Sequence, residues 1–162
     1  MNIYALSSGR GPSGIAIVRI SGKDTLKVCK NLTKLEEINS NEVNYCKFYD
    51  PNNDKIIDPE ALLLWFPGPN SYTGDDLAEF QVHGSNAVIN ALLKALSEQG
   101  NCRLAEPGEF TKIAFQNDKI DLLKAESIGD LIHAETELQR DQAVKLVQGN
   151  ACLLYTSPSP RD

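Results

Sequence analysis

One carboxylate stands within an apolar stretch of this sequence, where an acidic side chain needs a partner. Glu79 lies in the run 77–83, whose residues alternate as in a strand, so that Glu79 shares one face with Gln81. Burying a carboxylate costs free energy unless a partner compensates its charge. Two partners are open: a basic side chain such as Arg19, which would make a structural ion pair, or a ligand edge with two N–H donors. The residues alone favour the ion pair.

A glycine pattern near the amino terminus is the second feature that could do chemistry. Gly9, Gly11 and Gly14 match the spacing of the dinucleotide-binding fingerprint, which requires a helix to open at the third glycine. Here the segment 15–20 follows, an apolar, β-branched run typical of a strand. The pattern therefore indicates a flexible loop that lets two strands turn. The sequence contains no P-loop motif, so GTP binding of that kind is not expected of it.

The loop 67–74 is a third candidate for a site. It reads PGPNSYTG, which holds too many breaking residues for regular structure. It therefore presents Asn70, Ser71, Tyr72 and Thr73 from a rigid connection between two strands.

A fourth stretch begins at Glu106 with the letters EPGEF. Pro107 and Gly108 prepare a helix start, after which Phe110 and Phe115 are expected in the core. Lys119 comes at the junction between this helix and the next helical segment. A lysine at such a place is usually solvated, so the residue alone predicts no function for it.

Charge and composition limit the kinds of partner. Sixteen basic residues against 22 acidic ones give a net charge of −6, whereas a domain that grips nucleic acid alone needs a basic face. We therefore expect RNA contacts to lie mainly elsewhere in the parent protein. No apolar run approaches the roughly 20 residues of a membrane span, and no signal peptide is evident. The sequence predicts a cytoplasmic protein without membrane contact.

The four cysteines predict neither a disulfide framework nor a metal site. Cys29, Cys46, Cys102 and Cys152 are widely scattered, and no C-x-x-C pair occurs. We expect plain thiols that are buried or partly buried.

The periodicity predicts an α+β fold with a small mixed sheet and packed helices. Strands are expected at 3–6, 15–20, 43–49, 61–66 and 77–83, and helices over 23–32, from 85 to a stop at Gly100, and from about 108. Ser21 is the expected cap of the first helix. A helical recurrence between Ile120 and Val147 is long for a compact domain, which indicates entry into a separate helical domain.

The last eleven residues, 152–162, break this pattern. They read CLLYTSPSPRD, with two Ser-Pro steps and no helical period. The string resembles translated sequencing adapter, so we interpret it as a non-native tail. A native Pro/Ser linker is the alternative.

Three long stretches together carry a resemblance to a known family: GRGPSGIAIVRISG, LWFPGPNSYTGDDLAEFQVHGS and AEPGEFTKIAFQNDKIDLLKAESIGDLI. In this order and spacing, from about residue 3 to residue 149, they resemble the amino-terminal region of the MnmE (TrmE) family of tRNA modification GTPases. The resemblance implies an α+β fold similar to the tetrahydrofolate-binding domain of aminomethyltransferases. It also implies a folate-binding and dimerisation domain at 1–118, the beginning of a central helical domain at 119–151, and then the tail.

The resemblance further implies function. Members of this family bind 5-formyltetrahydrofolate at a homodimer, and the folate one-carbon unit contributes to a substituent on C5 of the wobble uridine of tRNA. The flavoprotein MnmG is the partner in that modification. GTP, Mg and K belong to a GTPase domain that lies outside this sequence, so complete catalytic activity is not expected of this chain alone.

The family's folate contacts match Arg19, Glu79 and Lys119. A pterin presents a 2-amino group beside a ring N–H, and one carboxylate can accept both donors, which is the role implied for Glu79. Arg19 and Lys119 would meet formyl or carbonyl oxygens, or the anionic glutamate tail.

The sequence departs from the family pattern at two places: Ile113 stands where many relatives have arginine, and Ser85 replaces the second glycine of the usual H-G-G. Neither affects the three matched positions. Two other functions stay open, namely a structural dimerisation module without a ligand and a free-standing folate-dependent one-carbon transferase. No nucleophile, acid/base pair or metal constellation accompanies the matched positions, which disfavours the transferase.

Overall fold

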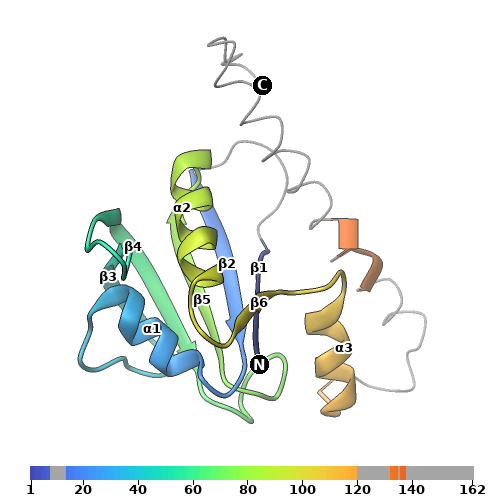
Figure 1. The fold of residues 1–162 in the computed structure, drawn as a ribbon. Coiled ribbons are helices and arrows are strands. Elements are labelled where there is room, and N and C mark those ends of the chain that lie inside the picture. Colours follow the sequence, from blue (N-terminus) through green and yellow to red (C-terminus); the bar gives the residue numbers. More distant parts are fainter. Residues whose placement is uncertain (8–13, 120–131, 135, 138–162) are drawn as a thin grey trace.

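A six-stranded mixed sheet forms the centre of the protein in a computed structural model, which describes residues 1–7, 14–119, 132–134 and 136–137 (Figure 1). The sheet order is β3-β4-β5-β2-β1-β6, and only β1 and β6 pair in parallel. The strands are β1 Asn2–Leu6, β2 Ile15–Ser21, β3 Val43–Tyr49, β4 Ile56–Phe66, β5 Leu77–His83 and β6 Cys102–Leu104. This arrangement confirms the predicted α+β class.

Among residues 14–119, three helices accompany the sheet: α1 Thr25–Thr33, α2 Asn86–Ser97 and α3 Glu109–Gln116. Helices α1 and α2 cover one face of the sheet, whereas α3 stands apart beside β1 (Figure 1). The main core lies under α1 and α2 and takes Tyr4 and Leu6 from β1. The alternate residues of β1, Ile3 and Ala5, instead pack with Phe110 of α3. Helix α3 therefore packs on the opposite face of the sheet.

Several predicted elements agree with the structure, including the strand that follows Gly14. Helix α2 begins as its sequence suggests, because the Ser85 side chain accepts a hydrogen bond from the Val88 N–H at 3.2 Å. Gly9 and Gly11, nearly all of the predicted helical segment 120–147, and the tail 152–162 lie outside the described residues. No described helix is long and apolar enough to cross a membrane.

The predicted cap of the first helix is wrong. Ser21 is buried as the last residue of β2, and its hydroxyl bonds the Thr73 hydroxyl at 2.8 Å and the Asp76 carbonyl at 2.9 Å. These partners hold Ser21 in the strand, so α1 begins only at Thr25. The Thr25 hydroxyl donates to the Gly22 carbonyl at 2.7 Å and fixes that turn.

Three further predictions need correction. Strand β4 begins at Ile56 instead of residue 61. The turn is shorter than expected, because it closes where the Asp50 N–H donates to the Lys55 carbonyl. Strand β6 was not predicted, since three residues are too few to show alternation. Phe115, expected in the core, is 38% exposed, whereas Phe110 is fully buried.

A surface ion pair at the start of α3 gives a pH-dependent contribution to stability. Arg103 donates to Glu109 at 2.8 Å, and this hydrogen bond lowers the pKa of Glu109 against the opposing effect of burial. A carboxyl whose pKa is lower in the folded state stabilises above its unfolded pKa, and this contribution is lost as the pH falls through the folded value. We therefore expect Glu109→Gln to lose less stability than the wild type between about pH 7 and about pH 3.

Urea unfolding of both proteins at the two pH values measures this difference. Glu36→Gln, at an exposed position, is the control and should keep the wild-type pH dependence. An equal pH dependence in Glu109→Gln and the wild type would contradict the assignment.

Candidate functional site

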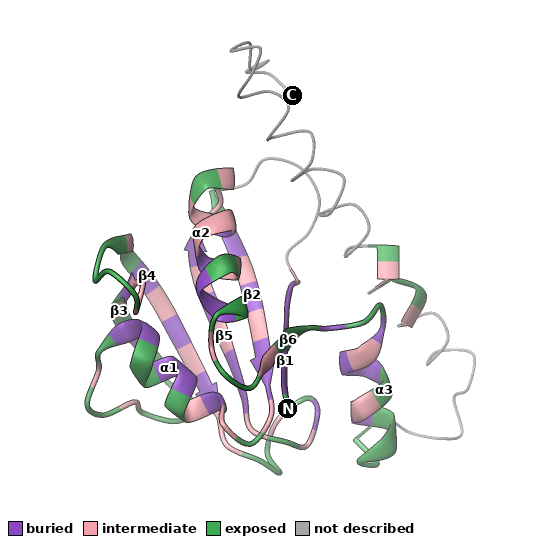
Figure 2. Cartoon of the chain, viewed as in Figure 1, coloured by how far each residue is buried: buried purple, intermediate pink, exposed green. Residues whose placement is uncertain are grey.

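Arg19 and Glu79 face each other across the centre of the sheet. They are direct partners in the antiparallel register of β2 and β5, and Nη2 of Arg19 lies 3.4 Å from Oε2 of Glu79. Buried and partly buried residues alternate along both strands, as Figure 2 shows. The two side chains are only 22% and 24% exposed. The ion pair expected from the residues is therefore present.

This ion pair leaves hydrogen-bonding capacity unused. Charge-assisted N–H···O bonds are usually about 2.7 to 2.9 Å long, so 3.4 Å is a loose contact. Moreover, Nε of Arg19 is buried without a hydrogen-bond partner among the described residues. A buried N–H without an acceptor costs roughly 1 to 3 kcal/mol. The pair thus offers a donor and a carboxylate that a polar ligand could satisfy.

Two aromatic rings flank the guanidinium of Arg19. Its carbon Cζ lies 5.2 Å from the ring centre of Tyr72 and 5.6 Å from that of Phe110, both within the range of cation–π attraction. Tyr72 is 39% exposed, whereas Phe110 is fully buried beneath. The site therefore has an apolar floor and an aromatic side chain at its surface, a setting that suits a flat ring with polar edges.

The loop from Pro67 to Asp76, called the 67–76 loop below, brings Tyr72 to this place. Its anchor is Thr73, which is fully buried and bonds the Ser21 hydroxyl on one side. On the other side the Thr73 carbonyl accepts a 2.7 Å bond from Nδ2 of Asn117. Gly74 has a φ of +88°, and a Cβ there would lie 2.9 Å from Cβ of Asn117. Only glycine fits this close approach without strain.

The end of α3 places Lys119 beside the same loop. Asp118 adopts a left-handed conformation (φ 57°), and the Lys119 N–H returns to the Ala114 carbonyl at 2.8 Å, which closes the helix. The ammonium of Lys119 then donates to the Pro69 carbonyl at 2.9 Å. The Tyr72 and Thr111 hydroxyls also lie 3.1 Å apart. Helix α3 and the residues after it therefore hold the loop through three side chains, those of Thr111, Asn117 and Lys119.

Of the three residues matched by resemblance, the structure joins two directly. Arg19 and Glu79 form one pair, whereas Lys119 contacts the backbone of the 67–76 loop, which supplies Tyr72. Asn117 was missed, since a polar residue at a helix end is too common to stand out. Phe110 was expected in the core but not as a neighbour of Arg19.

Removal of the Asn117 amide is expected to loosen the 67–76 loop. Asn117→Ala deletes the bond to the Thr73 carbonyl, so we expect a loss of about 1 kcal/mol in the free energy of unfolding. Amide hydrogen exchange of Gly74 should also become faster. Asn31→Ala removes an exposed amide contact with Gln99 and should change stability by less than about 0.5 kcal/mol. Unchanged exchange at Gly74 would contradict the role of Asn117.

Neither a metal cluster nor an activated thiol accompanies this site within the described residues. No cluster of three or more His, Cys, Asp or Glu residues there could hold a metal ion. Burial raises the pKa of Cys46 to about 12, with a smaller effect from Asp58, and raises that of Cys29 further. Thiols of this kind stay protonated and are poor nucleophiles. Cys29 is buried and both thiols are free, as expected of structural residues.

Comparison with known proteins identifies the family. Residues 2–119 match the family model described as GTP-binding protein TrmE N-terminus. The tRNA modification GTPase MnmE of Pelagibacter ubique is 60% identical over 151 residues, which cover 93% of this chain and 34% of that protein. MnmE of Rhodopseudomonas palustris is 46% identical, over 91% of this chain and 32% of its own length.

A mitochondrial protein of Danio rerio, named as a subunit of a 5-taurinomethyluridine tRNA synthase, is 43% identical over 94% of this chain and 30% of its own length. The chain thus spans about a third of the length of these relatives. With a family model matched over 118 residues and identities of 43 to 60%, the chain belongs to the MnmE (TrmE) family of tRNA modification GTPases and corresponds to its amino-terminal domain.

Proposed function

We propose that this chain is the folate-binding and dimer-forming module of a GTPase that modifies the wobble uridine of tRNA, and that Arg19, Glu79 and Lys119 contact the folate. The unsatisfied Arg19–Glu79 pair carries this proposal. In an ion pair with a purely structural role, we expect short hydrogen bonds and an acceptor for every buried N–H. Here the Arg19–Glu79 distance is long, and Nε of Arg19 has no acceptor among the described residues.

The chemistry of the site fits 5-formyltetrahydrofolate. The carboxylate of Glu79 can accept the 2-amino group and the adjacent ring N–H of a pterin, in a bidentate and charge-assisted contact. Nε of Arg19 can donate to a carbonyl or formyl oxygen. Tyr72, beside Arg19, gives the ring an aromatic surface. The bound folate would supply a one-carbon unit, while the residues of this chain would bind and orient it.

Lys119 has a second role in this proposal. An ammonium has three N–H donors, and one is used by the Pro69 carbonyl. The other two have no acceptor among the described residues and could bind the anionic glutamate tail of a folate. Lys119 would then connect the ligand to the 67–76 loop.

The family resemblance suggests the context of the module. Residues 1–118 would form the folate and dimer domain, and 119–151 the start of a helical domain. GTP, Mg and K would bind in the part of the relatives that this chain does not span, and MnmG and tRNA would join in the cytoplasmic complex. This division supports a binding role for the chain.

Calorimetric titration of the chain with 5-formyltetrahydrofolate tests the proposal. We expect saturable heat of binding from a chain that sedimentation shows to be a dimer. A folded dimer without heat of binding would favour the purely structural dimerisation module. Turnover of the folate by the isolated chain would instead favour the free-standing transferase.

A further inference from the structure

A buried carboxylate interrupts the sheet between β4 and β5. The pairing of these strands runs only as far as Leu62 and Gln81. Beyond that point the His83 N–H donates to Oδ2 of Asp58 at 2.8 Å, and the Glu60 N–H donates to Oδ1 at 3.0 Å. Asp58 is fully buried. Its side chain thus takes the place of a ladder bond and holds the two strands apart.

The same carboxylate fixes the imidazole of His83. Nδ1 of His83 lies 2.9 Å and 3.0 Å from the two oxygens of Asp58. A carboxylate only accepts, so Nδ1 carries the proton in this contact and Nε2 of the neutral ring presents a lone pair. The His83 side chain is 57% exposed, and within the described part of the chain its ring bonds through Nδ1 alone. In the neutral ring, Nε2 is therefore an oriented acceptor.

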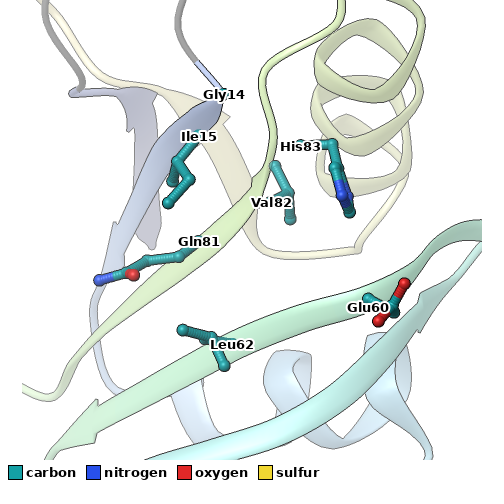
Figure 3. A pocket seen from close by; sticks show the side chains of 7 residues that line it. All are labelled: Gly14, Ile15, Glu60, Leu62, Gln81, Val82 and His83. Carbon is teal, nitrogen blue, oxygen red and sulfur yellow. The ribbon is translucent and has the colours of Figure 1, made fainter.

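A pocket of about 220 Å³ lies where the strands separate (Figure 3). It is lined by Gly14, Ile15, Glu60, Leu62, Gln81, Val82 and His83. Pockets for drug-sized ligands start at about 300 Å³, so this one has room for a single ring.

The lining defines the chemistry of the occupant. Ile15 and Leu62 give apolar walls that suit a flat ring, whereas the Val82 side chain is buried in the main core. The acceptors are Nε2 of His83 and the carboxylate of Glu60, which disfavour an anion, and the Gln81 amide can both donate and accept. We propose that this pocket binds an uncharged, planar heterocycle with an N–H donor, which Nε2 of His83 accepts while Asp58 positions the imidazole.

This pocket is separate from the Arg19–Glu79 pair. Glu79 and His83 are four residues apart on β5, which corresponds to about 13 Å along a strand. A ring held at His83 would therefore not be the pterin ring held at Glu79. In the purely structural alternative, Asp58 only ends the ladder and Nε2 of His83 takes no ligand.

Uracil is a suitable probe, because it is small, planar and uncharged and has N–H donors. The matched control is 1,3-dimethyluracil, which keeps the ring and loses both donors. In titrations of the 162-residue chain followed by NMR, we expect uracil to shift the His83 ring signals with the millimolar dissociation constant typical of a single-ring ligand. The dimethyl compound should bind about three- to ten-fold more weakly, as expected for one lost hydrogen bond.

His83→Asn separates the two functions of the imidazole. An asparagine amide can still donate to Asp58 in place of Nδ1, but it has nothing at the position of Nε2. We expect it to keep the fold and to bind uracil as weakly as the wild type binds the dimethyl compound.

Equal shifts with both compounds, or none with uracil up to its solubility limit, would overturn the proposal, and this comparison needs only the wild type. Full uracil affinity in a folded His83→Asn would overturn it too. A folate titration of the same sample reports on the Arg19–Glu79 pair independently.

Discussion

Glu79→Gln is expected to weaken the binding of 5-formyltetrahydrofolate by about 5- to 150-fold, or about 1 to 3 kcal/mol. The substitution keeps the size of the side chain but turns one acceptor oxygen into a donor, which would face the N–H donors of the pterin. It also leaves Arg19 without its carboxylate partner, since Nη2 lies 3.4 Å from Oε2 of Glu79. Calorimetric titration measures the change in affinity.

Glu36→Gln is the matched control, because Glu36 is exposed and lies outside the sheet. It should bind folate as the wild type does. Far-UV circular dichroism and sedimentation would show that both variants remain folded and associated. If a folded Glu79→Gln bound folate with unchanged affinity, Glu79 would not be the pterin contact.

Phe110→Ala should have the largest effect on stability, about 3 to 5 kcal/mol, as for other large-to-alanine changes in a core. Phe110 is fully buried and packs with Ile3 and Ala5 in the smaller core that fastens α3 to the sheet. Its ring also flanks Arg19 at 5.6 Å. The variant therefore removes both the packing of α3 and the floor of the candidate site.

Phe115→Ala, in the same helix, provides the comparison. Phe115 is 38% exposed, so its replacement should lower the free energy of unfolding by less than about 1 kcal/mol. Urea unfolding followed by fluorescence gives both values. Similar losses for the two variants would mean that α3 is not fastened through Phe110.

The alternation of apolar and polar residues along the chain predicted the central strands of the sheet well. The run 77–83 forms β5, and the expected partnership of Glu79 with Arg19 follows from a register in which they are direct neighbours. These predictions succeeded because strand faces repeat every second residue and each face has one environment. The folate role of the same residues stays a proposal, since it depends on the family resemblance.

Long-range contacts explain what the sequence did not reveal. Ser21 matches a helix cap by local pattern, but Thr73, 52 residues away, keeps it in a strand. Asp58 stands among turn-forming residues, and nothing local indicates that its carboxylate meets His83, 25 residues later. Whether a polar side chain bonds a local or a distant partner depends on the tertiary structure. A short sequence pattern shows only the local possibilities.

The attachment of the 67–76 loop to the end of α3 has a thermodynamic consequence. Tyr72 lies over Arg19 on a loop held by Asn117 and Lys119, so the candidate site and the chain leaving α3 share one set of hydrogen bonds. If a bound folate strengthens these hydrogen bonds, it must also restrain Lys119. By linkage, a change that pulls Lys119 away then weakens folate binding by the same factor. Affinity for the ligand would thus report the state of the chain that follows Lys119.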